Sequence, residues 1–331
     1  MSVKPIKESF LKNLTVLTGA PTAGKSLISP IVASFANTEN FRMSILLEHL
    51  GTLHKLGKLD TQTLVFLWRY TVDFMAYDNL IGRDMNLRFA DETSIFAKQQ
   101  EDVGEFLDRL LADRGEFKLT QLDTYKPLVL LTLTDAFCHA QEWFLAFPFV
   151  RFVWLRRHPI DLVYSWYNHR YGQTARPVKN VDRPSMTFGS ETYSSQLNQV
   201  LLIDAHPFPV PHYASEVSDE YEQLSEMDRV IYMIDQLTAQ MSASRKKLSE
   251  PQRTSVLEIE FDDLVHESEA IVEQLAEFLN TTTTELTFQV LAKEKCPRPR
   301  DDVRRNQKLS IIKAESSSGA FKRLEALVEK Y

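Results

Sequence analysis

The sequence predicts an α/β fold in which a central parallel sheet is covered by helices on both faces. Three observations predict it. Four short apolar runs lack the polar alternation of half-exposed strands, which is typical of strands buried on both faces. Amphipathic stretches with helical spacing separate these runs. The first run leads through a glycine-bounded turn into a helix, the connection at which parallel sheets commonly bind ligands.

The expected strands are spread along most of the chain. They cover residues 14–18, 128–133, 151–155 and 255–260. After the last strand, residues 264–279 are expected to form a helix, because their apolar positions repeat at helical spacing. Thr282 and Glu285 have the spacing of a capping box and predict the start of a further short helix.

Two regions interrupt this pattern, and we expect residues 1–331 to form a single domain that contains both. Residues from about 41 to 117 are helix-rich and predict a helical insertion between the first two of these strands. Residues from about 172 to 228 are polar and contain five prolines, so a long loop is expected there. Loops of this length in a compact domain are usually functional or disordered.

The composition of the 331 residues is that of an ordinary globular protein, with 44% apolar and 25% charged residues. A net charge of −7 disfavours binding to nucleic acid or to an anionic membrane. The two cysteines, Cys138 and Cys296, suit a reducing compartment. The N-terminal residues lack the apolar core of a signal peptide, and no apolar run is long enough to cross a bilayer. We therefore expect a cytoplasmic protein without a membrane span, and the sequence predicts no oligomeric state.

The turn after the first strand carries the most specific motif in the chain. Gly19, four residues, Gly24, Lys25 and Ser26 satisfy the phosphate-loop pattern. Such a loop turns backbone N–H groups inward above the positive end of the next helix. The alternative, a plain glycine-rich turn with a solvated lysine, is disfavoured because a strand precedes the motif and a helix follows it. The pattern predicts a nucleotide site made of Pro21, Thr22, Ala23, Gly24, Lys25 and Ser26.

A second anion-binding motif follows the third expected strand. Arg157 lies at the tip of this strand, and Pro159 suits the first turn of the next helix, where its missing N–H costs nothing. Ser165 comes eight residues after Arg157, about two helical turns further on. An arginine fork and a hydroxyl held by adjacent rigid elements form a clamp for a phosphate monoester. In the alternative, Arg157 pairs with Asp161 and Ser165 is merely packed.

With both motifs in this order, the chain resembles the sulfotransferases that use 3′-phosphoadenylyl sulfate as donor. In that family a strand–loop–helix phosphate loop holds the 5′-phosphosulfate, and an Arg-x-Pro segment with a serine eight residues after the arginine holds the 3′-phosphate. Arg157, Pro159 and Ser165 match the second motif position by position. Residues 256–264 resemble the family's strand and aromatic–acid–Asp–Leu turn before a late helix. The resemblance implies a P-loop NTPase-like three-layer sandwich with helical insertions.

The resemblance also implies an activity: transfer of a sulfuryl group from 3′-phosphoadenylyl sulfate to a hydroxyl or amine of a small-molecule or carbohydrate acceptor. No metal is required in this expectation, because the sulfuryl group carries less charge than a terminal phosphate. Lys25 would stabilise the leaving phosphate, and Asp135 by position or His139 by chemistry would take the acceptor's proton. Arg304 and Arg305, from a late basic cluster, would close over the 3′-phosphate. The insertion and the long loop would build the acceptor pocket.

Other functions remain open for the same residues. In many members of the family the basic residue of the loop directly follows the proline, where this chain has Thr22. A lysine after the second glycine is typical of loops that bind nucleoside triphosphates. An ATP-dependent kinase is therefore the enzymatic alternative, with Lys25 on the β- and γ-phosphates, Ser26 on Mg²⁺ and Asp135 as an acid in the outer coordination sphere of the metal. A nucleotide-binding protein without catalytic activity is the second alternative.

Simpler structural roles remain open for the remaining candidates. Asp135 would cap the helix that follows it. His139 would be packed or solvated. Arg304 and Arg305 would belong to a solvated run of charges.

Overall fold

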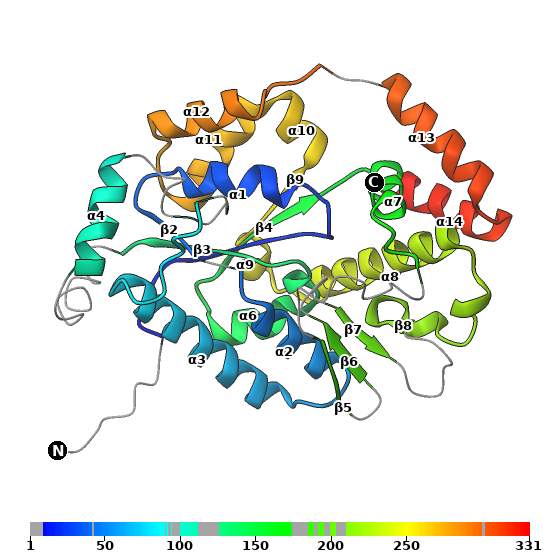
Figure 1. The fold of residues 1–331 in the computed structure, drawn as a ribbon, viewed down its shortest axis with the longest axis horizontal. Coiled ribbons are helices and arrows are strands. Elements are labelled where there is room, and N and C mark those ends of the chain that lie inside the picture. Colours follow the sequence, from blue (N-terminus) through cyan, green and yellow to red (C-terminus); the bar gives the residue numbers. More distant parts are fainter. Residues whose placement is uncertain are drawn as a thin grey trace.

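The molecule is built around one parallel β-sheet (Figure 1). The computed structural model describes residues 9–41, 43–89, 91, 94, 100–111, 126–173, 185–188, 191–194, 199–202, 210–299 and 302–331. The sheet has the strand order β2-β3-β1-β4-β9, and every neighbouring pair is parallel. Its strands are β1 (Leu14–Thr18), β2 (Thr38–Asn40), β3 (Leu128–Thr132), β4 (Arg151–Arg156) and β9 (Val256–Glu260). Helices flank this sheet, which confirms the predicted fold class.

The four predicted strands are all present, with ends that differ from the prediction by at most one residue. The apolar pattern does not predict β2, because its three residues, Thr38, Glu39 and Asn40, are all polar. β2 forms because it pairs with β3 at the edge of the sheet, with Glu39 opposite Val129.

Alternate residues of the strands point to opposite faces and supply two separate apolar cores. Val153 and Leu155 of β4 face one core, and Phe152 and Trp154 face the other. The first core is closed by α1 (Lys25–Ala33), α10 (Phe261–His266), α11 (Ser268–Leu279) and α12 (Glu285–Lys293). The second is closed by α2 (Ile45–Lys55), α3 (Thr61–Leu80), α6 (Ala140–Ala146), α7 (Pro159–Asn168), α8 (Glu226–Lys247), α13 (Asp302–Glu315) and α14 (Ser318–Glu329).

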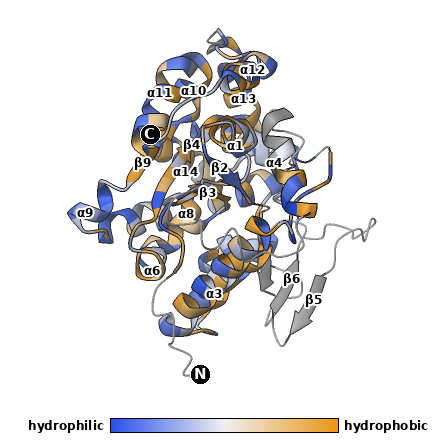
Figure 2. Cartoon of the chain, turned by 90° about the vertical axis from the view of Figure 1, so that its left-hand side faces the viewer, coloured by the Kyte–Doolittle hydropathy of each residue, from blue (hydrophilic) through white to orange (hydrophobic). Residues whose placement is uncertain are grey.

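Covering both faces explains why the strands are apolar without alternation. Outside the two cores, the short α9 (Glu250–Arg253) is hydrophilic and buries none of its residues (Figure 2). Within the described part of the chain, no helix combines the length and the apolar character needed to span a membrane.

The single helix predicted over 264–279 is two helices in the structure. α10 ends at His266, and α11 begins at Ser268. Glu267 between them has φ −124° and ψ 40°, which is not helical. The apolar spacing continues across this break, so periodicity alone does not reveal it.

The capping box predicted from Thr282 and Glu285 is wrong. The N-cap of α12 is Thr284, and its box partner is Thr287. A tertiary contact decides this, because the Thr284 hydroxyl donates to the carbonyl of Ser34 at the end of α1 (2.8 Å). The helix therefore begins two residues later than the local pattern predicts.

The region around 172–228 is not the long loop that its composition predicts. Its described residues contain a second, antiparallel sheet of β5 (Ser185–Phe188), β6 (Glu191–Ser194), β7 (Gln199–Leu202) and β8 (Val210–Pro211). Two short 3₁₀ helices follow, η3 (His212–Val217) and η4 (Tyr221–Gln223). Prolines are compatible with this sheet because Pro211 ends an edge strand, where a missing N–H costs little.

Helices α2, α3 and α4 (Gln100–Leu111) occupy the expected insertion between β2 and β3, and residues 112–117 lie outside the described part of the chain. A buried ion pair ties this insertion to the sheet. Arg109 Nη2 lies 2.6 Å from Glu39 Oε1 of β2, and the two side chains are 1% and 2% exposed.

We expect Arg109→Ala to lower the free energy of unfolding by about 3–5 kcal/mol, because the buried carboxylate of Glu39 loses its cation. Urea denaturation of the whole chain measures this. Arg83→Ala is the matched control, because Arg83 pairs with Asp78 while 63% exposed, and it should cost less than about 1 kcal/mol. Equal losses in the two variants would contradict the role given to the buried pair.

Candidate functional site

The loop after β1 has the strained backbone of a phosphate loop. Gly19, Thr22 and Gly24 all have positive φ angles, of 153°, 63° and 110°. A Cβ on Gly19 would lie 2.4 Å from the carbonyl oxygen of Leu155, and one on Gly24 would lie 2.3 Å from the ring of Phe261. Glycine is therefore required at both positions, because a Cβ would clash with a neighbouring residue and because the positive φ angles disfavour other residue types.

This backbone is the predicted anion-binding cradle. No described residue accepts a hydrogen bond from the backbone N–H groups of Thr22, Gly24, Lys25 or Ser26. These donors lie at the N-terminus of α1, where the helix dipole adds positive potential. Ser26 is exposed there. The N-terminus of α1 therefore presents backbone donors that no described residue uses.

Lys25 links the loop to a group of buried acids. Its Nζ donates to the carbonyl oxygens of Gly19 (2.6 Å) and Ala20 (2.9 Å). Burial lowers the pKa of Lys25 to about 8, and the negative charges of Glu48 and Asp135 partly oppose this shift. The ammonium group thus lies within electrostatic reach of both carboxyl groups.

Glu48, which no sequence motif singled out as a site residue, lies at the end of β3 in the structure. Its Oε1 accepts the backbone N–H of Thr134 (2.7 Å), and its Oε2 is buried without a hydrogen-bond partner in the described structure. Burial, followed by repulsion from Asp135, raises the pKa of Glu48 to about 8. A glutamate inside the apolar run 45–50 was the available signal, because an ionisable residue on a buried helix face is rare.

Asp135 lies just after β3 and is 5% exposed. Burial raises its pKa to about 6, while the charges of Lys55 and Lys25 hold the shift down. Its side chain makes no capping hydrogen bond to the 3₁₀ helix that follows, η2 (Ala136–His139). The helix-cap alternative for Asp135 is therefore wrong.

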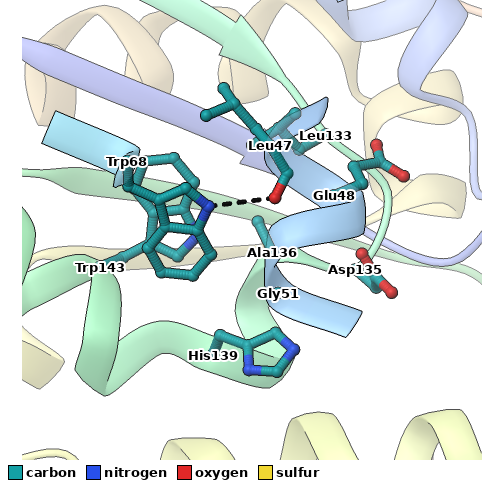
Figure 3. A pocket seen from close by; sticks show the side chains of 9 residues that line it. All are labelled: Leu47, Glu48, Gly51, Trp68, Leu133, Asp135, Ala136, His139 and Trp143. Carbon is teal, nitrogen blue, oxygen red and sulfur yellow. Dashed lines mark hydrogen bonds between the residues drawn. The ribbon is translucent and has the colours of Figure 1, made fainter. Parts of the chain in front are cut away.

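Glu48, Asp135 and His139 line one pocket, and His139 faces a different part of it from the two acids (Figure 3). The carboxyl groups of Glu48 and Asp135 lie on one side, and the imidazole lies near the stacked indoles of Trp68 and Trp143. The His139 ring meets Trp68 edge-on at 6.2 Å, and burial lowers the pKa of His139 to about 3. The environment of His139 matches the alternative in which its side chain is packed. Of the two predicted bases, Asp135 is the one that lies near Lys25.

Arg157 makes direct contact with the phosphate loop. Its Nη1 donates to the carbonyl of Thr22 (2.5 Å), and its guanidinium lies 4.9 Å from the centre of the Phe261 ring. Its Nε is buried without a partner in the described structure, so one donor is available to a ligand. Ser165 lies two turns along α7 and is partly exposed. The two motifs found in the sequence therefore meet at adjacent carboxyl ends of β1 and β4.

Asp161 is neutralised by the late basic cluster instead of by Arg157. Arg305 of α13 contacts Asp161 (2.8 Å) and Asp262 (2.6 Å), and Lys308 contacts Asp161 (2.5 Å). Arg305 thus belongs to an ordered ion-pair network near the Arg157 corner, and the solvated-run alternative is wrong for it. Arg304 beside it is exposed.

The structure therefore brings the two predicted anion-binding elements, the loop with Lys25 and the corner with Arg157, to neighbouring strand ends. Two buried carboxyl groups with raised pKa values lie beside Lys25, the arrangement expected of acid–base residues. The described residues contain no cluster of three or more metal-binding side chains of the His, Cys, Asp and Glu types.

Comparison with known proteins gives no match to a family model or to a curated relative. Solved structures are similar over most of the chain. The sulfotransferase domain of the Synechococcus PCC 7002 olefin synthase has 10% identity over 91% of this chain and 82% of that chain, with a TM-score of 0.42. The sulfotransferase domain of the curacin biosynthetic pathway has 13% identity over 88% and 79%, with a TM-score of 0.44.

The sulfotransferase of Alicyclobacillus acidocaldarius is similar over 96% of both chains, with 13% identity and a TM-score of 0.39. Solved sulfotransferases are thus among the structures that this chain resembles. Similarity at this level assigns no activity to this chain.

Proposed function

We propose that this protein transfers a sulfuryl group from 3′-phosphoadenylyl sulfate to a hydroxyl or amine group of a small-molecule or carbohydrate acceptor. The hydrogen bond from Arg157 to the carbonyl of Thr22 carries the proposal, because it joins the two anion-binding elements. A donor with a 5′-phosphosulfate and a 3′-phosphate needs two such elements. A nucleoside triphosphate, with its phosphates in one row, needs only the loop.

The proposed reaction is an in-line displacement at sulfur. The acceptor oxygen or nitrogen forms a bond to sulfur while the bond from sulfur to the bridging phosphate oxygen breaks. The products are the sulfated acceptor and adenosine 3′,5′-bisphosphate. Lys25 and the loop N–H groups stabilise the charge that develops on the leaving phosphate. The acceptor's proton goes to a carboxylate of the site.

Asp135 is the better proton acceptor of the two buried acids. With a pKa of about 6 it is mostly ionised near neutral pH, whereas Glu48, with a pKa of about 8, is mostly protonated. A neutral Glu48 can donate a hydrogen bond to the acceptor or to Asp135. The pair therefore offers one base and one donor.

The acceptor side of the proposed site comes from the two regions that interrupt the α/β pattern. Glu48 comes from α2 in the 41–117 region, and η3 in the 172–228 region brings His212 to 3.9 Å from Asp135. These positions support a single functional unit over 1–331. The cysteines Cys138 and Cys296 are free thiols, which supports the expected cytoplasmic location.

Calorimetric titration distinguishes this proposal from an ATP-dependent kinase. We expect adenosine 3′,5′-bisphosphate to bind much more tightly than ATP or ADP, with no change when EDTA replaces Mg²⁺. A kinase would bind ATP with Mg²⁺ in preference. Tight ATP binding with weak bisphosphate binding would overturn the proposal.

Arg157→Ala is expected to weaken binding of adenosine 3′,5′-bisphosphate by about 10- to 100-fold, because a charge-assisted hydrogen bond to phosphate is lost. Affinity for adenosine 5′-phosphate, which lacks the 3′-phosphate, should change much less. Arg156→Ala is the matched control, because the neighbouring Arg156 pairs with Glu260 (3.0 Å). Preserved selectivity for the 3′-phosphate in Arg157→Ala would contradict the placement of this end of the donor.

A further inference from the structure

His212 is a buried histidine whose ring has no hydrogen-bond partner in the described structure. It begins η3 directly after β8 and is 2% exposed. Neither Nδ1 nor Nε2 has a partner there. Its Nε2 lies 3.9 Å from Oδ2 of Asp135. Buried polar groups in folded proteins are nearly always hydrogen-bonded, so an exception at this position calls for a functional explanation.

The backbone of His212 is held by a hydrogen bond, whereas its ring nitrogens make none in the described structure. Lys55 Nζ donates to the His212 carbonyl (3.3 Å) and to Gln240 Oε1 (3.1 Å), which ties η3 to α2 and α8. The ring of Tyr213 lies 4.0 Å from that of His212 and limits the directions in which it can turn. The residue is thus anchored through its backbone, and its ring nitrogens are without partners in the described structure.

The ionisable groups around this pair come from four elements. They are Lys25 of α1, Glu48, His49 and Lys55 of α2, Cys138 and His139 of η2, and Tyr213 of η3. Burial, then the charge of Lys55 and the neighbouring histidines, keeps the pKa of His212 well below its usual value. His212 is therefore neutral, with one N–H to donate. Asp135, with a pKa of about 6, is the carboxylate that can accept it.

We propose that His212 is a positioning residue that donates its Nε2–H to Asp135 and holds that carboxylate ionised and directed at the acceptor. The inference rests on the proposed function, in which Asp135 takes the acceptor's proton. The present separation exceeds a hydrogen bond by less than about 1 Å, which side-chain rotation can close. The proton from the acceptor goes to Asp135, and His212 keeps its own proton throughout.

The test is a pH titration of the Asp135 carboxyl group by ¹³C NMR in the full chain labelled at aspartate Cγ, with Asp135→Asn to assign the signal. We expect His212→Phe to raise the titration midpoint by about 1–2 pH units, since a hydrogen bond to the ionised form is lost. His212→Gln keeps an N–H donor and should restore a midpoint close to that of the unmodified protein. Tyr213→Phe is the matched control for local packing and should leave the midpoint in place.

A midpoint unchanged in His212→Phe, or shifted equally in His212→Gln, would overturn the proposal. The ¹⁵N chemical shifts of His212 in the unmodified protein give a second measurement that needs no variant to fold. They should show a proton on Nε2 and none on Nδ1, and the opposite tautomer would also overturn the proposal. Failure of adenosine 3′,5′-bisphosphate to bind would reject the proposed function but not the contact between His212 and Asp135. The NMR titration needs no nucleotide and tests that contact separately.

Discussion

Asp135→Asn is expected to lower kcat by about 10²- to 10⁴-fold, the usual contribution of a positioned general base. The amide has nearly the same shape as the carboxylate but takes no proton from the acceptor. Binding of adenosine 3′,5′-bisphosphate should persist, because Asp135 is assigned to the acceptor side. Transfer of ³⁵S from labelled donor measures the rate, as labelled sulfate with water as acceptor and as labelled product with a panel of alcohols, sugars and amines.

Glu48→Gln is the matched control for this experiment. Because the pKa of Glu48 is about 8, glutamine reproduces the neutral form that prevails near pH 7. We expect a loss of less than about tenfold, well below that of a general base. A large loss in Glu48→Gln with little loss in Asp135→Asn would reverse the roles of the two acids.

Lys25→Ala is expected to lower kcat/KM by about 10²- to 10³-fold, the range found when one donor to a developing negative charge is removed. The reason is the position of its Nζ, which contacts the loop carbonyls of Gly19 and Ala20 and lies within reach of the two acids. Steady-state rates with varied donor concentration measure the loss. A change in KM alone would contradict a role in the transition state, because it would mean that only ground-state binding was lost.

Asp135 and Lys25 together predict a bell-shaped dependence of kcat/KM on pH. Asp135 must be ionised, so the rate should fall below about pH 6 as this carboxylate takes up a proton. Lys25 must be charged, so the rate should fall again above about pH 8 as its ammonium loses a proton. Lys25→Arg keeps the charge at high pH and should move the alkaline limb upward. An alkaline limb unchanged in Lys25→Arg would assign it to another group.

The features of this protein that the sequence predicts are set by residues that lie close together in the chain. The strands were predictable because continuous apolar runs reflect burial on both faces of the sheet. The predicted phosphate loop could be recognised because the glycines, the lysine and the start of α1 lie within one short segment. Arg157 and Ser165 belong to one strand–helix corner, so their spacing also carries the information. Each of these signals is contained in a short segment.

Other parts depended on contacts between distant segments. The start of α12 was decided by the hydrogen bond between Thr284 and Ser34, and the break at Glu267 left no mark in the apolar pattern. The antiparallel sheet over 185–211 forms by pairing between strands, which local composition does not encode. Choosing between Asp135 and His139 required knowledge of which side chain lies near Lys25.

By itself, the sequence determined the layered α/β fold and the two anion-binding motifs, because their physical causes act between residues close in the chain. Only the tertiary structure brings together the groups of the proposed acid–base site, because Glu48, Asp135 and His212 come from separate elements. Burial sets the pKa values of these groups, and burial is a property of the packed molecule. A side chain acquires its chemical role there from the neighbours that folding brings to it.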